Sequence, residues 1–503
     1  MRARWPSILL LGAALLPFGA ARRATAQVPV TDDLVIRGDT VLQPGVYTVD
    51  DVHEDGVIQI AADGVTLDGA GVVIQGTGFR GYGIRMNGHS GLNLRHFTIR
   101  GFDYGISIEN ASNVTIEGSD VSGNRKDTRT DFLDIGCGGC YGGGILFRDV
   151  SASRVRRNTL TDESTGLEII GGGKNTVYAN RFSQGPADNE THQDSCWGLR
   201  LDGSTENQVR ANVADYVDRE RYGLSSGDSA GILLVNGAHR NQILGNSMTH
   251  SGDGFFLGNT CARESDGNLV SGNDGSSSPH NAFEATFSTG NVFDHNRADH
   301  SDYGFWLGYS HDSRVTGNEI VGNASAGIAI EHGHGNEIDH NTLTSNPWGI
   351  QLWAADTTCP WPECGASCPS AAYKIHDNAI TLNAVGLSIE NTAGAAVTHN
   401  RLVNNTLNVR VAGQSTAVVL TNNDLTCRTS RPTLCQTAVS NEMAKGLNVN
   451  AANNYWGTTN AAAIPGLILD HEDDAKLGKV VFVPFLRRPV AVARGHLELG
   501  LGM

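Results

Sequence analysis

A short module that recurs about every 22 residues limits what this chain can fold into. Four copies follow one another between residues 249 and 336, as THSGDGFFLGN, PHNAFEATFS, HSDYGFWLGYS and SAGIAIEHGHGN. Each copy places a small residue before an apolar-x-apolar triplet, and tags that end in Asn separate the copies. The small residues along the chain are Gly83, Gly105, Gly144, Gly166, Gly198, Gly231, Gly254, Ala282, Gly304, Gly327, Gly349 and Gly386. The tags supply a second series at Asn158, Asn180, Asn212, Asn246, Asn273, Asn296, Asn318, Asn341, Asn378, Asn400 and Asn423. The shortest separations in both series equal this period, and the longer ones are the same period plus an insertion.

The apolar residues of each module alternate and show no helical period. A repeat of this length holding two or three short alternating segments matches one coil of a parallel β-helix, in which every second side chain fills the interior. An Asn at a fixed turn would lie above its equivalents and connect backbone groups from coil to coil. The period therefore predicts an all-β fold, a parallel β-helix of about 22 residues per coil.

The motifs GI-x-I and N-x-I-x-x-N, between about Ile58 and Asn423, resemble the right-handed parallel β-helix repeat superfamily. VTLDGAGVVIQGTG (65–78) is similar to the opening coils of NosD-like periplasmic proteins, and NNYWG (453–457) to a closing segment of the superfamily. The resemblance implies a right-handed solenoid. It leaves activity open, because the same fold carries lyases, hydrolases, epimerases, a copper-accessory protein and adhesins.

The chain divides into four predicted parts. Residues 1–26 have arginines, an apolar run and a small-x-small cleavage site before Gln27, which is typical of a secretory signal peptide. An N-terminal cap (27–57), the β-helix (58–430) and a C-terminal closing segment (431–503) follow. The mature protein is expected to be secreted or periplasmic, with no membrane insertion, and monomeric.

The negative charge of the chain disfavours some classes of binding partner. The formal charge is −16, and it becomes −20 on removal of residues 1–26, which hold four arginines and no acidic residue. A strongly acidic surface argues against nucleic acid or another polyanion as partner.

Nine cysteines in an exported chain favour disulfides over zinc. Cys427 and Cys435 enclose a short loop and are a candidate pair. Cys137 and Cys140 flank Gly-Gly, and Cys359, Cys364 and Cys368 share another loop; structural bridging is expected there too.

Insertions point to the working face of a solenoid, since loops grow only where they disturb no neighbouring coil. They fall at about 125–143, 185–197, 216–229, 274–281 and 355–370. These positions flank the triplet strands and predict a groove with those strands as its floor. Alternation places two tryptophans, a phenylalanine and several carboxylates outward along this floor, and such a strip suits stacking and hydrogen bonding of sugar rings.

The groove therefore predicts a polysaccharide-active enzyme, with hydrolysis preferred. Glu284 and Glu331 lie two coils apart, about 11–12 Å between Cα atoms by strand and coil spacing, and could act as the carboxylate pair of an inverting glycosidase. The candidate catalytic residues are Glu284, Glu331, Asp302, Asp253 and His332. The candidate substrate-binding residues are Trp306, Trp353, Tyr309, Phe256, Arg200 and His280. The structural alternatives are a satellite core for the tryptophans and a stacked ion pair for Glu168 and Arg200.

Three other functions stay open. A polysaccharide lyase or epimerase would use Arg200, His280 or His332 as its base. A NosD-like copper-accessory protein could bind a metal through His250, His300, His332 and His334. A non-catalytic surface protein would bind glycan without turnover. No cofactor and no metal ligand set is predicted, and a structural or catalytic cation such as calcium stays open.

Overall fold

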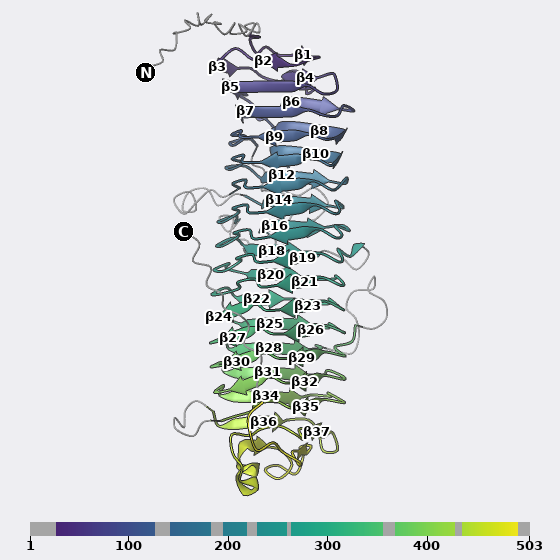
Figure 1. Cartoon of the computed structure of the whole chain (residues 1–503), viewed down its shortest axis with the longest axis vertical. Coiled ribbons are helices and arrows are strands. Elements are labelled where there is room, and N and C mark those ends of the chain that lie inside the picture. The colour runs from purple at the N-terminus through teal and green to yellow at the C-terminus, as the bar shows by residue number, and fades with distance from the viewer. Residues whose placement is uncertain are drawn as a thin grey trace, which may run out of the picture.

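The computed structural model describes residues 27–125, 141–182, 195–218, 229–258, 263–355, 368–427 and 435–490. Short parallel strands stack on one another in a single column, from β1 at the N-terminal end to the closing segment at the C-terminal end (Figure 1). Each coil of the chain adds one strand to each of two long parallel sheets and one position to a third, shorter one. The predicted parallel β-helix is confirmed.

The first sheet holds the triplet strands. From the N-terminus its members pair in parallel with the next coil, for example β18 with β20 and β20 with β22. Its strands are β1 (Leu34–Ile36), β4 (Ile58–Ile60), β6 (Tyr82–Asn87), β8 (Tyr104–Ser112), β10 (Gly143–Ser151), β12 (Thr165–Ile170), β14 (Trp197–Asp202), β16 (Ala230–Val235), β18 (Asp253–Leu257), β20 (Asn281–Ala285), β22 (Tyr303–Trp306), β25 (Ala326–Glu331), β28 (Trp348–Trp353), β31 (Val385–Glu390), β34 (Leu407–Ala412), β36 (Thr437–Asn441) and β38 (Ile468–Leu469).

The second sheet holds the strands of the tags, most of them three residues long. Its strands are β2 (Thr40–Val41), β3 (Gly45–Thr48), β5 (Thr66–Gln75), β7 (Asn93–Arg100), β9 (Thr115–Glu117), β11 (Arg154–Arg156), β13 (Thr176–Tyr178), β15 (Gln208–Arg210), β17 (Gln242–Leu244), β19 (Leu269–Ser271), β21 (Val292–Asp294), β23 (Arg314–Thr316), β26 (Glu337–Asp339), β29 (Lys374–His376), β32 (Ala396–Thr398), β35 (Val419–Thr421), β37 (Val449–Asn450) and β39 (Val480–Val481).

The third sheet follows the marker asparagines. Its strands are β24 (Glu319–Val321), β27 (Thr342–Thr344), β30 (Ala379–Thr381) and β33 (Arg401–Val403). Toward the N-terminus the same line continues as single-residue bridges, such as those from Ser247 to Asp274 and from Asp274 to Arg297. Two short 3₁₀ helices, η4 (Ala461–Ala463) and η5 (Pro465–Leu467), belong to the closing segment. Among the described residues, no helix is long and apolar enough to cross a membrane.

The core fills the column because alternate side chains point inward. Phe255, Phe283 and Phe305 occupy one register position on successive coils and are fully or almost fully buried, as the alternation predicts. The rings of Phe283 and Phe305 stack with centroids 5.0 Å apart. This burial supplies most of the favourable free energy of the fold, since it is proportional to the apolar area removed from water.

Close packing of the backbone explains the series of small residues. A Cβ placed on Gly327 would lie 2.7 Å from the carbonyl oxygen of Gly349 on the next coil, and one on Gly304 would lie 2.6 Å from that of Gly327. The requirement is therefore for space and not for an unusual backbone conformation. The structure offers no account of why Ala282 is tolerated in the same series.

Side chains of the marker asparagines form a ladder inside the column. The Nδ2 group of Asn318 donates to the carbonyl oxygen of Phe293 and to Oδ1 of Asn341, while Oδ1 of Asn318 accepts from the backbone N–H of Asn296. The predicted ladder is confirmed. Two more ladders accompany it, through Asn207, Asn241, Asn268 and Asn291, and through Asn323, Asn346, Asn383 and Asn405.

A disulfide joins Cys427 to Cys435, which confirms that predicted pair. Cys196 and Cys368 are also disulfide-bonded. The signal peptide, Cys137, Cys140, Cys359, Cys364 and most of four predicted insertions lie outside the described residues. The groove that those insertions predict therefore stays a prediction, as do the boundaries at residues 57 and 430.

Candidate functional site

The outward face of the first sheet, from β18 to β28, carries the candidate site. The strands are in register, so that Phe256, Glu284, Trp306, Ala329 and Gln351 follow one another along this face, one residue on each coil. Side chains from successive modules of the sequence thus become neighbours, about 4.8 Å apart along the column.

A polar cluster forms where β18 meets β20. Asp253 is fully buried, and its Oδ1 lies 2.9 Å from Nδ1 of His280 and accepts from the backbone N–H of Asn281 at 3.0 Å. The side chain of His280 is 41% exposed, so Asp253 fixes one edge of the ring while the other edge turns away from it. A buried carboxylate of this kind sets the orientation and the tautomer of a histidine.

Glu284 extends this cluster. Its Oε2 lies 3.9 Å from Nδ1 of His280 and accepts from Nδ2 of Asn281 at 2.5 Å. Nδ2 of Asn281 also lies 3.0 Å from Nδ1 of His280, which places three polar groups around one ring nitrogen. Two carboxylates and an imidazole in one contact group are the side chains that general acid–base catalysis uses. Two predicted catalytic residues and one predicted substrate-binding residue therefore come together.

An aromatic strip begins one coil beyond Glu284. Trp306 lies next to Glu284 in register, and its ring meets that of Tyr303 edge-on with centroids 5.0 Å apart. Trp306 also meets Trp353 at 5.6 Å, although these residues are two coils apart. All three side chains are partly exposed. The strip offers apolar faces and polar edges beside the acid–base cluster.

Glu331 and Asp302 lie on the same face but away from the cluster. Glu331 pairs in register with Trp353 on β28, two coils beyond Glu284. Asp302 accepts from the hydroxyl of Ser325 at 2.5 Å. The structure thus places the predicted Glu284–Glu331 pair across the aromatic strip, and it does not bring Glu331 into the cluster of Glu284.

Arg200 forms the ion pair with Glu168 that was the structural alternative to substrate binding. Its guanidinium pairs with Glu168 and Asp202 at 2.5 Å each and lies over the ring of Trp197. The side chain is 5% exposed, so it has little surface left for a substrate. This arrangement removes Arg200 from the proposed binding residues.

The predicted substrate-binding role of Phe256 is wrong, because its side chain is also buried. It belongs to a second hydrophobic cluster on the outer face of the first sheet, and it is 3% exposed. Stacking with a sugar needs an open ring face, which Phe256 lacks. The members of this cluster are Cys196, Trp197, Ala230, Leu233, Val235 and Phe256.

His332 and Tyr309 lie in a column of rings just past the triplet strands. Tyr309 stacks on Phe287 at 4.9 Å and on His332 at 5.2 Å. Nε2 of His332 accepts from the backbone N–H of Ala355, so Nδ1 carries the proton and donates to the carbonyl oxygen of Cys368 at 2.6 Å. Both ring nitrogens are thus bonded to backbone, and a base role for His332 is not supported. Tyr309 stays a candidate at the edge of the strip.

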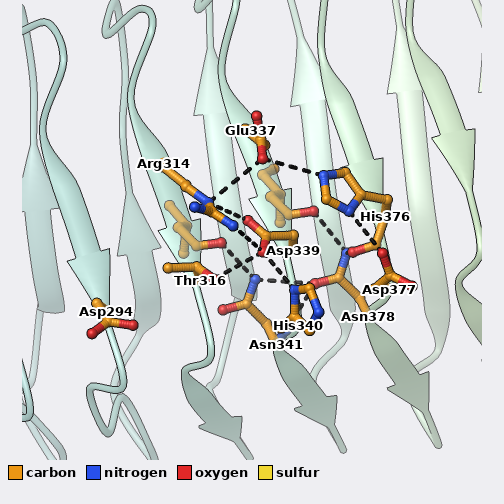
Figure 2. A network of polar contacts seen from close by, with 12 residues as sticks. Asp294, Arg314, Thr316, Glu337, Asp339, His340, Asn341, His376, Asp377 and Asn378 are labelled. Carbon is orange, nitrogen blue, oxygen red and sulfur yellow. Dashed lines mark hydrogen bonds and ion pairs between the residues drawn. The ribbon is translucent and has the colours of Figure 1, made fainter. Parts of the chain in front are cut away.

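A separate polar network covers the second sheet on β23, β26 and β29 (Figure 2). The guanidinium of Arg314 donates two hydrogen bonds of 2.7 Å to the carboxylate of Asp339, which also accepts from the hydroxyl of Thr316. Nδ1 of His340 lies 2.6 Å from the same carboxylate. Burial alone would raise the pKa of Asp339, but the hydrogen bonds from Arg314, His340 and Thr316 outweigh it and lower the pKa to about 2.

Glu337 connects this network to the next coil. Its carboxylate lies 3.5 Å from Arg314 and 3.3 Å from Nε2 of His376, and Nδ1 of His376 contacts Asp377 at 2.9 Å (Figure 2). The contacts of Arg314 with Asp339 and of Glu337 with His376 each join adjacent coils. The network therefore ties coils together and is not a second candidate site.

The sequence interpretation missed one residue of the site. Asn281, which holds Glu284, comes directly after His280 and precedes the small residue of its module, so the repeat itself could have identified it. Tyr303, which lies beside Trp306, occupies the equivalent position one coil later.

Family models match the repeated region. The model described as right-handed beta helix region matches residues 47–183 and 82–262. The fold is a right-handed parallel β-helix. The model described as periplasmic copper-binding protein (NosD) matches residues 188–359. No curated protein matches the chain in sequence.

Several solved β-helix structures are similar to this one at low sequence identity. The mannuronan C-5 epimerase AlgE6 A-module of Azotobacter vinelandii is 15% identical, with 81% of this chain and 91% of that one covered and a TM-score of 0.34. The alginate lyase of a Paenibacillus species is 13% identical, with 64% and 97% covered and a TM-score of 0.35. The Dettilon tailspike protein is 13% identical, with 82% and 62% covered and a TM-score of 0.35.

Proposed function

We propose that this right-handed β-helix is an exported enzyme that cleaves a polysaccharide bound along the outward face of β18 to β28. The observation that carries the proposal is the cluster of Asp253, His280 and Glu284 beside the Trp306 strip. It combines groups that can exchange protons with a surface on which sugar rings can stack.

Hydrolysis fits the charges of this face better than elimination. A lyase or epimerase acting on a uronic acid must neutralise the substrate carboxylate. Of the outward residues that follow one another in register from Phe256 on β18 to Ser388 on β31, none is a lysine or arginine. Carboxylates line the strip instead, and they suit a neutral or cationic glycan.

In the proposed reaction Glu284 starts protonated and gives its proton to the glycosidic oxygen as that bond breaks, while Glu331 takes a proton from the water that attacks from across the strip. After product release Glu331 loses its proton to solvent, and His280, oriented by Asp253, returns a proton from solvent to Glu284. Trp306 and Trp353 position the sugars. An inverting mechanism is expected, because the two carboxylates lie two coils apart and leave room for the water.

The test is a screen of the purified protein against neutral, cationic and acidic glycans. New reducing ends without unsaturated products support hydrolysis, and unsaturated products would assign elimination instead. Glu284→Gln should lower kcat/KM by about 10²-fold or more. Glu390→Gln is the matched control, since Glu390 lies outward on the same sheet and pairs with Arg410. Unchanged turnover in Glu284→Gln would remove this site from the reaction.

A copper-accessory role is the second candidate, favoured by the match of the NosD model to residues 188–359. Under this alternative the chain binds a copper ion and does not turn over glycan. Metal analysis of protein purified without chelator would support it by finding stoichiometric copper, and copper far below one equivalent would count against it.

A further inference from the structure

Two histidines on successive coils face each other just past the triplet strands, on the flank of the candidate site. His311 and His334 form a bridge in the backbone ladder, and their rings stack with centroids 4.5 Å apart and planes 10° apart. The flanking positions of the same ladder are Thr289 and Ala371, so the pair is confined to two coils.

Carboxylates lie at both edges of the ring of His311. Oδ2 of Asp312 lies 3.1 Å from Nδ1, on the edge proposed to face the ion, and Oε2 of Glu264, from two coils earlier, lies 3.7 Å from Nε2 at the opposite edge. A Cβ on Gly335 would meet Oδ1 of Asp312 at 2.3 Å, which shows that this carboxylate lies over the next coil, beside His334. One ligand atom each from His311, Asp312 and His334 lies within 4.8 Å of the others.

No hydrogen bond in the described part of the chain accounts for the position of the His334 ring. The ring makes no hydrogen bond or ion pair with the described part of the chain, whereas His332 two residues earlier has both nitrogens bonded to backbone. A neutral imidazole has a lone pair on one ring nitrogen, and that nitrogen is the atom that binds a metal ion.

We propose that His311, His334 and Asp312 bind one divalent transition-metal ion, Zn²⁺ or Cu²⁺. Two imidazoles with a carboxylate suit these ions, and Ca²⁺ or Mg²⁺ would need oxygen ligands throughout. Donor atoms around such an ion lie roughly 3 Å apart with bonds of about 2.1 Å. The two ring planes are nearly parallel, so at least one ring must turn about its side-chain bonds before both lone pairs point at one ion. Both rings are partly exposed and Asp312 is exposed, which leaves room for this turn. The site does not depend on glycan cleavage, and it would supply the residues for the second candidate function.

Titration of the metal-free, full-length mature protein with Zn²⁺ or Cu²⁺ by calorimetry tests the site. One equivalent should bind, and His334→Ala and His311→Ala should each weaken binding by about tenfold or more. His295→Ala is the matched control, because His295 is an exposed turn histidine with the carboxylate of Asp294 as its partner. Unfolding midpoints of the variants should show that the fold is kept.

Electron paramagnetic resonance of the Cu²⁺-loaded wild-type protein provides a reading that needs no variant. Hyperfine splitting from two imidazole nitrogens is expected. Splitting from fewer than two, or binding that both histidine variants retain, would overturn the proposal. Loss of binding in Asp253→Asn but not in His334→Ala would place the ion at the acid–base cluster instead. His334→Ala should keep its glycan turnover while it loses metal binding. The test of the metal site is thereby independent of the test of the proposed hydrolase activity.

Discussion

The hydrogen bonds to the carboxylate of Asp339 contribute to the free energy of unfolding in a way that depends on pH. Its side chain is fully buried on the second sheet, and three neighbours hold it in the ionised form. The folded state thus has a lower pKa for this carboxyl than the unfolded chain does. Stability from such a group is present above the unfolded pKa and is lost as the pH falls through the folded one.

Asp339→Asn should lower the free energy of unfolding by about 2 kcal/mol at pH 7, because Arg314 and His340 lose their common acceptor. The difference from the wild type should shrink as the pH falls from about 4 toward about 2, where Asp339 itself takes up a proton. Urea unfolding at several pH values measures it. Asp294→Asn, on the same row of the sheet, is the control and should cost less. An equal loss at both ends of this pH range would contradict the explanation.

Individual site residues could be predicted from their outward positions, but their pairings could not. Asp253 and His280 are separated by more than one period of the repeat, and the insertion between them conceals that they belong to adjacent coils. Whether His280 turns toward Asp253 or toward solvent depends on side-chain rotation, which no period encodes. For His311 and His334 a signal existed, since their separation in the sequence matches the length of one coil.

The asparagine ladders show how one residue type stabilises the whole set of turns. Each amide both donates and accepts between coils inside the column, where no water can replace it. The marker series could be predicted because it recurs with the period. The two other ladders were missed, although an Asn precedes or follows the marker by five residues in several tags, as at Asn268, Asn323 and Asn346.

Asn318→Ala should therefore destabilise the fold by about 3 kcal/mol, because the buried backbone N–H of Asn296 loses its acceptor and the carbonyl oxygen of Phe293 loses a donor. The midpoint of urea unfolding measures the effect. Asn87→Ala is the control, since Asn87 is exposed and bonds Asn110 on the surface. Similar midpoints for the two variants would show that the ladder contributes little.

At the scale of the whole molecule, the closing segment covers the last coils of the column. Strand β37 pairs with β35, β38 pairs with β36, and Trp456 is fully buried. Without this segment the last strands would present unpaired N–H and C=O groups to other chains. The sequence predicted a closing segment from NNYWG, but the way it covers the column depends on contacts outside the repeat.

A chain that ends at Asn441 should associate end to end, because the edges of β35 and β36 become available for pairing. Size-exclusion chromatography with light scattering should then show oligomers or aggregates, and the full-length protein is the reference. A truncated chain that stays as dispersed as the full-length one would mean that β36 protects its own edge.

The stacking of coils also decides where the molecule opens. The described strands of each coil pair only with those of the coil before it and the coil after it. Separation in the middle therefore exposes two new ends, whereas loss of a terminal coil exposes no more than was exposed already. Thermal unfolding therefore begins at the terminal coils, and the amide hydrogens of these coils exchange with solvent soonest. Strands β18 to β28 are remote from both ends (Figure 1). Their side chains keep their spacing while the outer coils open and close.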